Sequence, residues 1–360
     1  MKISVKIVAS AFALSALAMS GCGTTPTEEV RNFDFTSFNV IDLSTVEPQR
    51  VSPQEMIIGI SNNICMVSDS IMAIEDSNAS DMQLWLLNVN SGKFAQCLYK
   101  GNGPKECLGT TNIWVDNGYL FAGGFHDHKI MRIAVDPDSL TTDIECLAEL
   151  PEYFIKAITL SDSTLLYSPS TVPDVRYLSV SLDGTVTDTV GEFLLTDRLE
   201  EGIRPENHMF QTEIALSPDE RHMVASGTFW PMIEIYSVPF DKTIVLNGPI
   251  EIDSKIEKTQ YGAFQTPLWL ILRNLNVCDD GFAVRFMGIK PYVDDSFNED
   301  ESLLFFDWEG NPTKRFKLGR KITAFTVDFK SMTLYVLMDD PEPMVVKYAL
   351  PVSYDELWER

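Results

Sequence analysis

The amino-acid sequence predicts an all-β fold, a six-bladed β-propeller. One pattern recurs along the chain: an apolar segment, a polar turn centred on an aspartate, and a second apolar segment. The turn aspartates are Asp69, Asp116, Asp162, Asp219, Asp279 and Asp328. They lie 47, 46, 57, 60 and 49 residues apart, which is the spacing of propeller blades. A second pair of apolar segments follows each of the first five patterns, so each of these units has the four short strands of a blade.

The third unit illustrates the strand signal. Residues 178–182 read LSVSL, in which apolar side chains alternate with serines, and Asp183-Gly184 follows as a strong hairpin turn. The same strands could also build a two-sheet sandwich. The regular recurrence of the aspartate turn favours the propeller over this alternative.

The sixth unit ends near residue 350 without a fourth strand. Residues 33–43, FDFTSFNVIDL, precede the first complete unit and have an alternating, aromatic-rich pattern. We expect this N-terminal segment to close the last blade as its outer strand, because closure removes an exposed sheet edge. The propeller then spans residues 33–352, and residues 353–360 form a short amphipathic helix or tail.

The N-terminus has the features of a secretory signal. Two lysines precede an uncharged apolar run at residues 7–19, which is too short to span a membrane, and small residues come directly before Cys22. This stretch resembles the lipobox of bacterial lipoproteins, in which the cysteine is acylated. We therefore expect residues 1–21 to be a lipoprotein signal peptide and residues 22–32 to be the lipidated cysteine with its tether. The alternative is an ordinary secreted protein with an incidental cysteine.

The net charge argues against one class of partner, and the number of cysteines argues against a disulfide framework. The chain has 28 Lys and Arg against 52 Asp and Glu, a net charge of −24, which becomes −26 without the signal. Such a surface repels nucleic acid. Five cysteines follow Cys22, an odd number at irregular spacing that indicates buried thiols rather than a disulfide framework. The one pair that merits checking for a bridge is Cys97 with Cys107.

The chain resembles the TolB-like six-bladed β-propeller lipoproteins of Bacteroidota, a family largely without assigned activity. Three features carry the likeness: the lipobox at Cys22, the sequence GNGPKE at residues 101–106, and the SPDE turn at residues 217–220. The resemblance covers most of residues 33–350. Together with the lipobox it implies a lipid-anchored protein of the cell envelope, at the outer membrane, in the periplasm or exposed at the surface.

Long connections predict the binding face. In a propeller, the connections between second and third strands and between successive blades share one face, and the longest loops of this chain fall there. The aromatic candidates for ligand contact on this face are Phe229, Trp230, Tyr261, Phe264, Trp269 and Tyr292. Trp230 is the first choice, because Pro231 holds a tight connection that leaves its ring little room to fold back. Acidic neighbours favour a neutral or cationic ligand.

The sequence offers little catalytic chemistry. His126 and His128 form its one histidine cluster and would need a third ligand to bind zinc. The acidic stretch at residues 294–301 lacks the loop spacing of a calcium site. We therefore predict no catalytic residue, metal site or cofactor, and a membrane-anchored binding module for a glycan, peptide or envelope protein. The alternative is a propeller enzyme, a lyase or hydrolase that uses His126 or His128 with carboxylates at the channel mouth.

Overall fold

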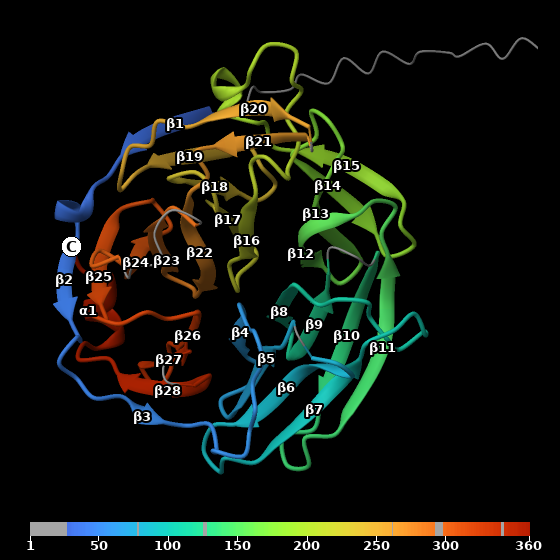
Figure 1. The fold of residues 1–360 in the computed structure, drawn as a ribbon, viewed down its shortest axis with the longest axis vertical. Helices are drawn as coiled ribbons and strands as arrows, with labels where there is room; N and C mark the ends of the chain where they lie inside the picture. The colour runs from blue at the N-terminus through green and yellow to red at the C-terminus, as the bar shows by residue number, and fades with distance from the viewer. Residues whose placement is uncertain (1–26, 78, 125–127, 261, 292–297, 340–341) are drawn as a thin grey trace, which may run out of the picture.

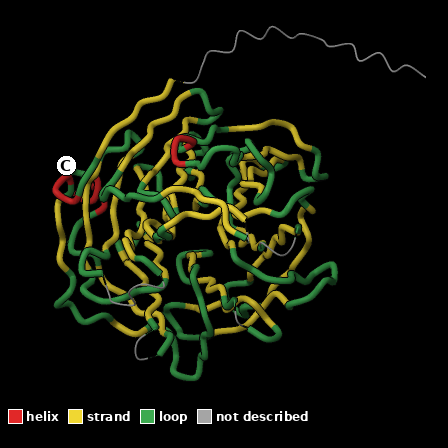
Figure 2. Tube along the Cα trace, turned by 45° about the horizontal axis from the view of Figure 1, so that its top comes forward, coloured by secondary structure: helices red, strands yellow, loops and turns green. Residues whose placement is uncertain are grey.

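The structure, a computed structural model, describes residues 27–360 except 78, 125–127, 261, 292–297 and 340–341. Six sheets stand in a ring around a central axis (Figure 1). Figure 2 shows the same ring tilted, with strand as its dominant secondary structure. The predicted six-bladed β-propeller is confirmed. The signal segment and Cys22 lie outside the described residues.

Each blade has four strands in order from the centre of the ring to the outside, and the fourth and fifth blades each have a fifth strand at the outer edge. The innermost strands are β4 (Ile64–Met66), β8 (Asn112–Asp116), β12 (Phe154–Ser161), β16 (Thr212–Leu216), β22 (Leu270–Val277) and β26 (Ala324–Asp328). The second strands are β5 (Ile71–Glu75), β9 (Tyr119–Gly123), β13 (Thr164–Pro169), β17 (His222–Gly227), β23 (Gly281–Ile289) and β27 (Thr333–Met338). The third strands are β6 (Met82–Asn88), β10 (Lys129–Val135), β14 (Tyr177–Ser181), β18 (Met232–Ser237), β24 (Ser302–Asp307) and β28 (Met344–Ala349). The fourth strands are β7 (Phe94–Tyr99), β11 (Thr142–Glu149), β15 (Val186–Val190), β19 (Lys242–Asn247), β25 (Pro312–Lys317) and β3 (Gln49–Arg50).

The core lies between adjacent blades. Every residue of β5 is buried, since both faces of a middle strand pack against neighbouring blades, whereas most of the outer strand β15 is exposed. One apolar cluster joins Ile158 and Tyr177 of the third blade to Ile214 and Tyr236 of the fourth. Because apolar side chains cover both faces of a blade, its inner strands carry almost continuous apolar runs. Polar residues within these runs therefore stand out as candidates for function.

An N-terminal strand does close the last blade, as expected, but its position differs from the prediction. The strand that pairs with the outer edge of β28 is β3, which covers only Gln49–Arg50. Residues 33–43 contain instead β2 (Asn39–Asp42), which runs parallel to β25 as a fifth strand of the fifth blade. The expectation that residues 33–43 close the sixth blade is therefore wrong. The alternating pattern indicates a strand but does not specify which blade edge accepts it.

The N-terminal segment forms a belt around half of the ring. Strand β1 (Thr27–Asn32) pairs in parallel with β19 of the fourth blade, β2 lies on the fifth, and β3 completes the sixth (Figure 1). Between β1 and β2, a 3-10 turn at Phe35–Ser37 is capped by Asp34. The belt is held by Phe33 and Phe38, whose buried rings contact Phe306 edge to face at centroid distances of 5.1 and 5.3 Å.

Three smaller elements complete the described fold. A hairpin of β20 (Lys255–Thr259) and β21 (Gly262–Thr266) connects the fourth and fifth blades, and a 3-10 turn at Thr196–Arg198 follows the third. Helix α1 (Tyr354–Trp358) lies within the segment expected to be helical. Ser353 and Glu356 form its capping box. No helix among the described residues is long and apolar enough to cross a bilayer.

Candidate functional site

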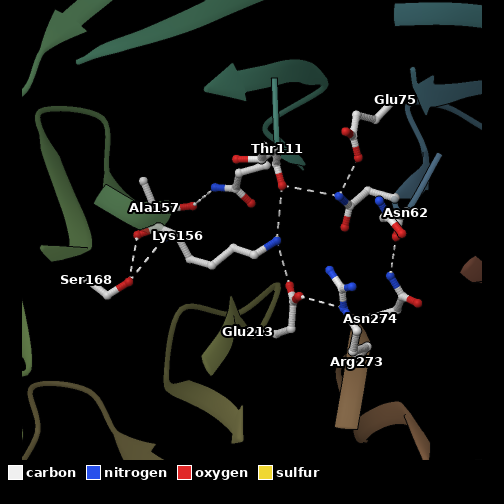
Figure 3. Close-up of polar contacts among 11 residues, drawn as sticks. Asn62, Glu75, Thr111, Lys156, Ala157, Ser168, Glu213, Arg273 and Asn274 are labelled. Atoms are coloured by element: carbon white, nitrogen blue, oxygen red, sulfur yellow. Dashed lines mark hydrogen bonds and ion pairs between the residues drawn. The ribbon is translucent and has the colours of Figure 1, made fainter. Parts of the chain in front are cut away.

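A cluster of four charged side chains lies at one mouth of the central channel. Lys156, Glu213 and Arg273 stand on the innermost strands of the third, fourth and fifth blades, and Glu75 ends the second strand of the first. The mouth is on the face where successive blades are connected, which is the face predicted to bind. These residues line a cavity of about 230 Å³. Figure 3 shows their side chains converging from different blades.

A buried ion pair joins two blades at this mouth. Nζ of Lys156 lies 2.7 Å from Oε2 of Glu213, and the two side chains are only 8% and 9% exposed. Nζ also donates to the carbonyl of Thr111 at 3.4 Å, so Lys156 reaches three blades. Burial alone would raise the pKa of Glu213, but the charges of Lys156 and Arg273 outweigh it and hold this pKa below its ordinary value. Glu213 is therefore ionised at neutral pH.

Arg273 approaches the same carboxylate less closely. Its Nε lies 3.9 Å from Oε1 of Glu213, beyond hydrogen-bond distance, and this nitrogen is buried without a hydrogen-bond partner among the described residues. The next residue, Asn274, has a positive φ of 55°, and the register of β22 with β23 shifts here. At this bulge two consecutive residues line the channel. Arg273 lines the mouth cavity, and Asn274 lines the channel beyond it and donates its amide to the carbonyl of Asn62 at 2.7 Å.

Glu75 is the fourth charged member of the cluster. Its side chain is buried, and Oε2 accepts a hydrogen bond from the Asn63 amide at 2.7 Å. Burial raises the pKa of Glu75 to about 7, although the Asn63 bond and the nearby charges of Lys156 and Arg273 each act to lower it. This carboxyl therefore changes its protonation state near neutral pH, unlike Glu213.

A second, larger cavity of about 500 Å³ continues along the channel. Asn63, Lys156 and Glu213 line both cavities and so separate the polar mouth from the channel interior. Below them all six innermost strands contribute to a wall of mixed polar and apolar side chains. Its apolar members include Ile64, Ile158, Ile214, Leu275, Phe325 and Val327. The size is that of a small-molecule pocket.

Comparisons with known proteins agree with this architecture. Residues 54–330 match the family described as TolB-like 6-blade propeller-like. The chain belongs to this family. The resemblance drawn from the lipobox, the GNGPKE segment and the SPDE turn thus led to the correct family.

Two solved structures from Bacteroides resemble this TolB-like propeller. A Bacteroides fragilis protein described as exported has a TM-score of 0.54 and 13% identity, covering 87% of this chain and 89% of its own. A member of the DUF4221 family from Bacteroides vulgatus has a TM-score of 0.55 and 10% identity, covering 84% of this chain and 95% of its own. At such identities the likeness shows the fold alone. No curated protein matches the chain.

Trp230, the first-choice ligand contact in the TolB-like propeller, does not have the exposed ring that we expected. The side chain is 2% exposed, its Nε1 donates to the carbonyl of Met209 at 3.1 Å, and its ring stacks on Phe210 at a centroid distance of 5.8 Å. The expectation that Pro231 prevents the ring from folding back is wrong. The ring turns inward because Phe210 and the Met209 carbonyl satisfy its apolar face and its N–H together.

The other aromatic candidates do not gather around the channel. Phe229 is partly buried against the same core as Trp230, and Trp269 is partly buried with Nζ of Lys290 4.6 Å from its ring centroid. Phe264, on β21, is 45% exposed. Tyr261 and Tyr292 lie outside the described residues. None of the four described aromatics lines the two channel cavities.

The described histidine of the enzymatic alternative does not face the channel either. His128 lies directly before β10, where its Nδ1 is 2.9 Å from the carbonyl oxygen of Leu150 and its ring packs on Tyr153. His126 lies outside the described residues. Within the described part of the chain, no group of three or more His, Cys, Asp or Glu side chains is placed to hold a metal. Cys97 is a free thiol, so it forms no bridge to Cys107.

The site residues predicted from the sequence did not include Glu75, Lys156, Glu213 and Arg273. A signal for three of them was present, since each is a lone charge within an apolar innermost-strand segment: FIKAITLS, TEIAL and LILRNLNV. Burial of an ionised side chain is costly unless it is paired, so charges at such positions indicate a built polar site. The described aromatic candidates lie away from the two channel cavities, whereas these charged residues line them.

Proposed function

We propose that this propeller is a membrane-anchored, extracytoplasmic recognition module that binds a glycan or peptide segment at the channel mouth without chemically converting it. One observation carries the proposal: two cations and two carboxylates, contributed by four blades, surround a cavity at the mouth. A site assembled from several blades is specific to the folded ring. The channel below it adds both apolar and polar surface for a ligand that enters further.

The chemistry of the mouth supports binding better than catalysis. The carboxylate of Glu213 is engaged by Lys156, and the hydroxyl of Ser77 donates to the carbonyl of Ile60 at 2.8 Å rather than to a base. A nucleophile needs a base within hydrogen-bond reach that is itself held by a third group. The described lining residues of the mouth do not form such a chain. The propeller enzyme is therefore the second candidate, and conversion of a screened compound would indicate it.

Ser77 offers a direct way to block the mouth. It is exposed and lines the mouth cavity, so Ser77→Trp is expected to fill this space without disturbing the core. A matched control is Ser91→Trp, at an exposed turn between β6 and β7 on the opposite face. Full-length protein would be screened against envelope glycans and peptides, with binding measured by calorimetry and the recovered ligand analysed by mass spectrometry.

We expect ligand binding that Ser77→Trp abolishes and Ser91→Trp preserves, with the ligand recovered intact. Equal ligand binding by both variants would show that the mouth is not the binding site. Conversion of a screened compound would favour the propeller enzyme instead.

Anchoring through Cys22 is a separate part of the proposal. It is supported by the signal-like segment and the Ser-Gly-Cys sequence, and the similar Bacteroides fragilis protein is described as exported. Cells expressing the wild type or Cys22→Ala would be labelled with a palmitate analogue and fractionated. We expect label and membrane association for the wild type alone, and an unlabelled wild type would contradict lipidation.

A further inference from the structure

The guanidinium of Arg273 has hydrogen-bond donors that the described residues leave unused. Among the described residues, its buried Nε has no hydrogen-bond partner, and neither do Nη1 and Nη2. The side chain is 28% exposed and lines the mouth cavity, so part of it faces open space. In Figure 3 the guanidinium points toward the space between Lys156 and Asn62. A guanidinium presents a planar set of N–H groups that matches the two oxygens of a carboxylate.

Each neighbouring carboxylate has a closer partner than Arg273. Glu213 receives Lys156 at 2.7 Å, and Glu75 accepts from Asn63 at 2.7 Å. The nearby Arg285 forms an ion pair with Glu301, in which Nη2 lies 2.6 Å from Oε1. Arg273 and Lys156 thus share the carboxylate of Glu213. Lys156 contacts one of its oxygens directly, whereas Arg273 only approaches the other. No carboxylate among the described residues lies within hydrogen-bond distance of the Arg273 guanidinium.

We propose that the channel mouth recognises a ligand carboxylate, which accepts hydrogen bonds from Nη1 and Nη2 of Arg273. This inference rests on the proposed function, because it names the ligand chemistry of the same mouth. An acidic sugar and the C-terminus of a peptide both carry the required group. Amide side chains of Asn62, Asn63 and Gln211 line the same cavity and suit the hydroxyl or amide groups of either ligand.

The strong negative charge of the whole protein does not oppose this recognition at contact distance. Exposed charges are screened beyond about 8 Å at physiological ionic strength, whereas Arg273 would touch the ligand directly. An ion pair in a partly buried mouth is also screened less than one on the surface. The ligand class therefore differs from the neutral or cationic one that the overall charge suggests.

Acetate and its neutral isostere acetamide provide the simplest test. Each would be titrated into full-length, isotope-labelled protein while the backbone amide signals of the mouth residues are followed by NMR. We expect saturable shifts with acetate that acetamide does not produce. Arg273→Gln should weaken acetate binding about tenfold, and Arg273→Lys, which keeps the charge but loses the planar fork, should weaken it less. Arg132→Gln, on the outside of the second blade, is the matched control and should change nothing.

Two further probes distinguish the sources of the carboxylate. Trigalacturonate and trialanine would be compared with their methyl ester and amide, respectively, and the acid that binds more tightly identifies the class. Equal shifts with acetate and acetamide, absence of saturation, or unchanged binding by Arg273→Gln would overturn the proposal. If these occur while Ser77→Trp still blocks a screened ligand, only the carboxylate inference fails. If acetate binds through Arg273 but Ser77→Trp blocks no screened ligand, the proposed recognition function fails instead.

Discussion

Nζ of Lys156 lies 2.7 Å from Oε2 of Glu213, so a buried ion pair links the innermost strands of the third and fourth blades. Removing one partner leaves an uncompensated charge in a site that water reaches poorly. We therefore expect Glu213→Gln to lower the free energy of unfolding by about 3–5 kcal/mol. Urea titration of the full-length protein would measure this change.

A double variant tests the cause of that loss. Lys156→Met combined with Glu213→Gln removes both charges and should recover much of the stability, because the loss comes from the unpaired charge. The exposed pair of Lys330 with Asp69 is the control, and Lys330→Ala should leave the unfolding midpoint unchanged. A double variant no more stable than Glu213→Gln would contradict this explanation.

Glu75 should make stability depend on pH. Burial raises its pKa from 4.5 to about 7 in the folded protein, so the folded state holds this proton more tightly than the unfolded state. Its favourable contribution is fully present below pH 4.5 and is lost as the pH rises through about 7. The loss should approach about 3 kcal/mol. In Glu75→Gln this dependence is absent, so the variant should gain stability relative to the wild type across that interval. Parallel pH profiles for the two proteins would contradict the raised pKa.

The N-terminal belt should contribute strongly to stability through its phenylalanines. Phe38 is buried and contacts Phe306 edge to face, so Phe38→Ala is expected to cost about 3–5 kcal/mol. Val40, two residues later on β2, is 54% exposed, and Val40→Ala is the matched control. Thermal and urea unfolding would compare the two. Equal stability of the variants would mean that the belt is attached only loosely to the ring.

Trp230 should act as a core residue. Its ring packs on Phe210 and its N–H is satisfied by Met209, so Trp230→Ala should cost about 3–5 kcal/mol. Phe264, which is 45% exposed, is the control, and Phe264→Ala should change stability by less than about 0.5 kcal/mol. The reverse order of effects would show that the ring of Trp230 is exposed in solution.

The blade count was predictable because every repeat has an aspartate turn between its two inner strands. Asp219 shows why this turn is a strong signal: its carboxylate accepts from the Ser217 hydroxyl and from the Arg221 backbone N–H, which fixes the loop locally. The closing strand was not predictable in the same way. Strand β3 spans two residues, Gln49–Arg50, too few to show any alternation. Its pairing depends on which blade edge remains open once the ring has formed.

The charged mouth could have been found from the repeats themselves. Lys156, Glu213 and Arg273 each stand six residues before the turn aspartate of their own unit, at 162, 219 and 279. Equivalent positions of a propeller face the channel at the same depth, so equivalent polar residues meet there. Their partners could not be read from the sequence. Lys156 pairs with Glu213 because of blade packing, and the distance of Arg273 from Glu213 depends on a bulge at Asn274 that the sequence does not reveal.

The pairing of Arg50 with Val346 has a consequence for how the chain folds. These residues are 296 positions apart in the sequence, so the sixth blade gains its fourth strand only after almost the whole chain has been synthesised. The conformational search needed to bring such distant segments together slows folding. Until then the edge of β28 stays open to pairing with other chains. Ring closure is therefore expected to be the last folding step, and the period before it is when the newly made protein is most prone to aggregate.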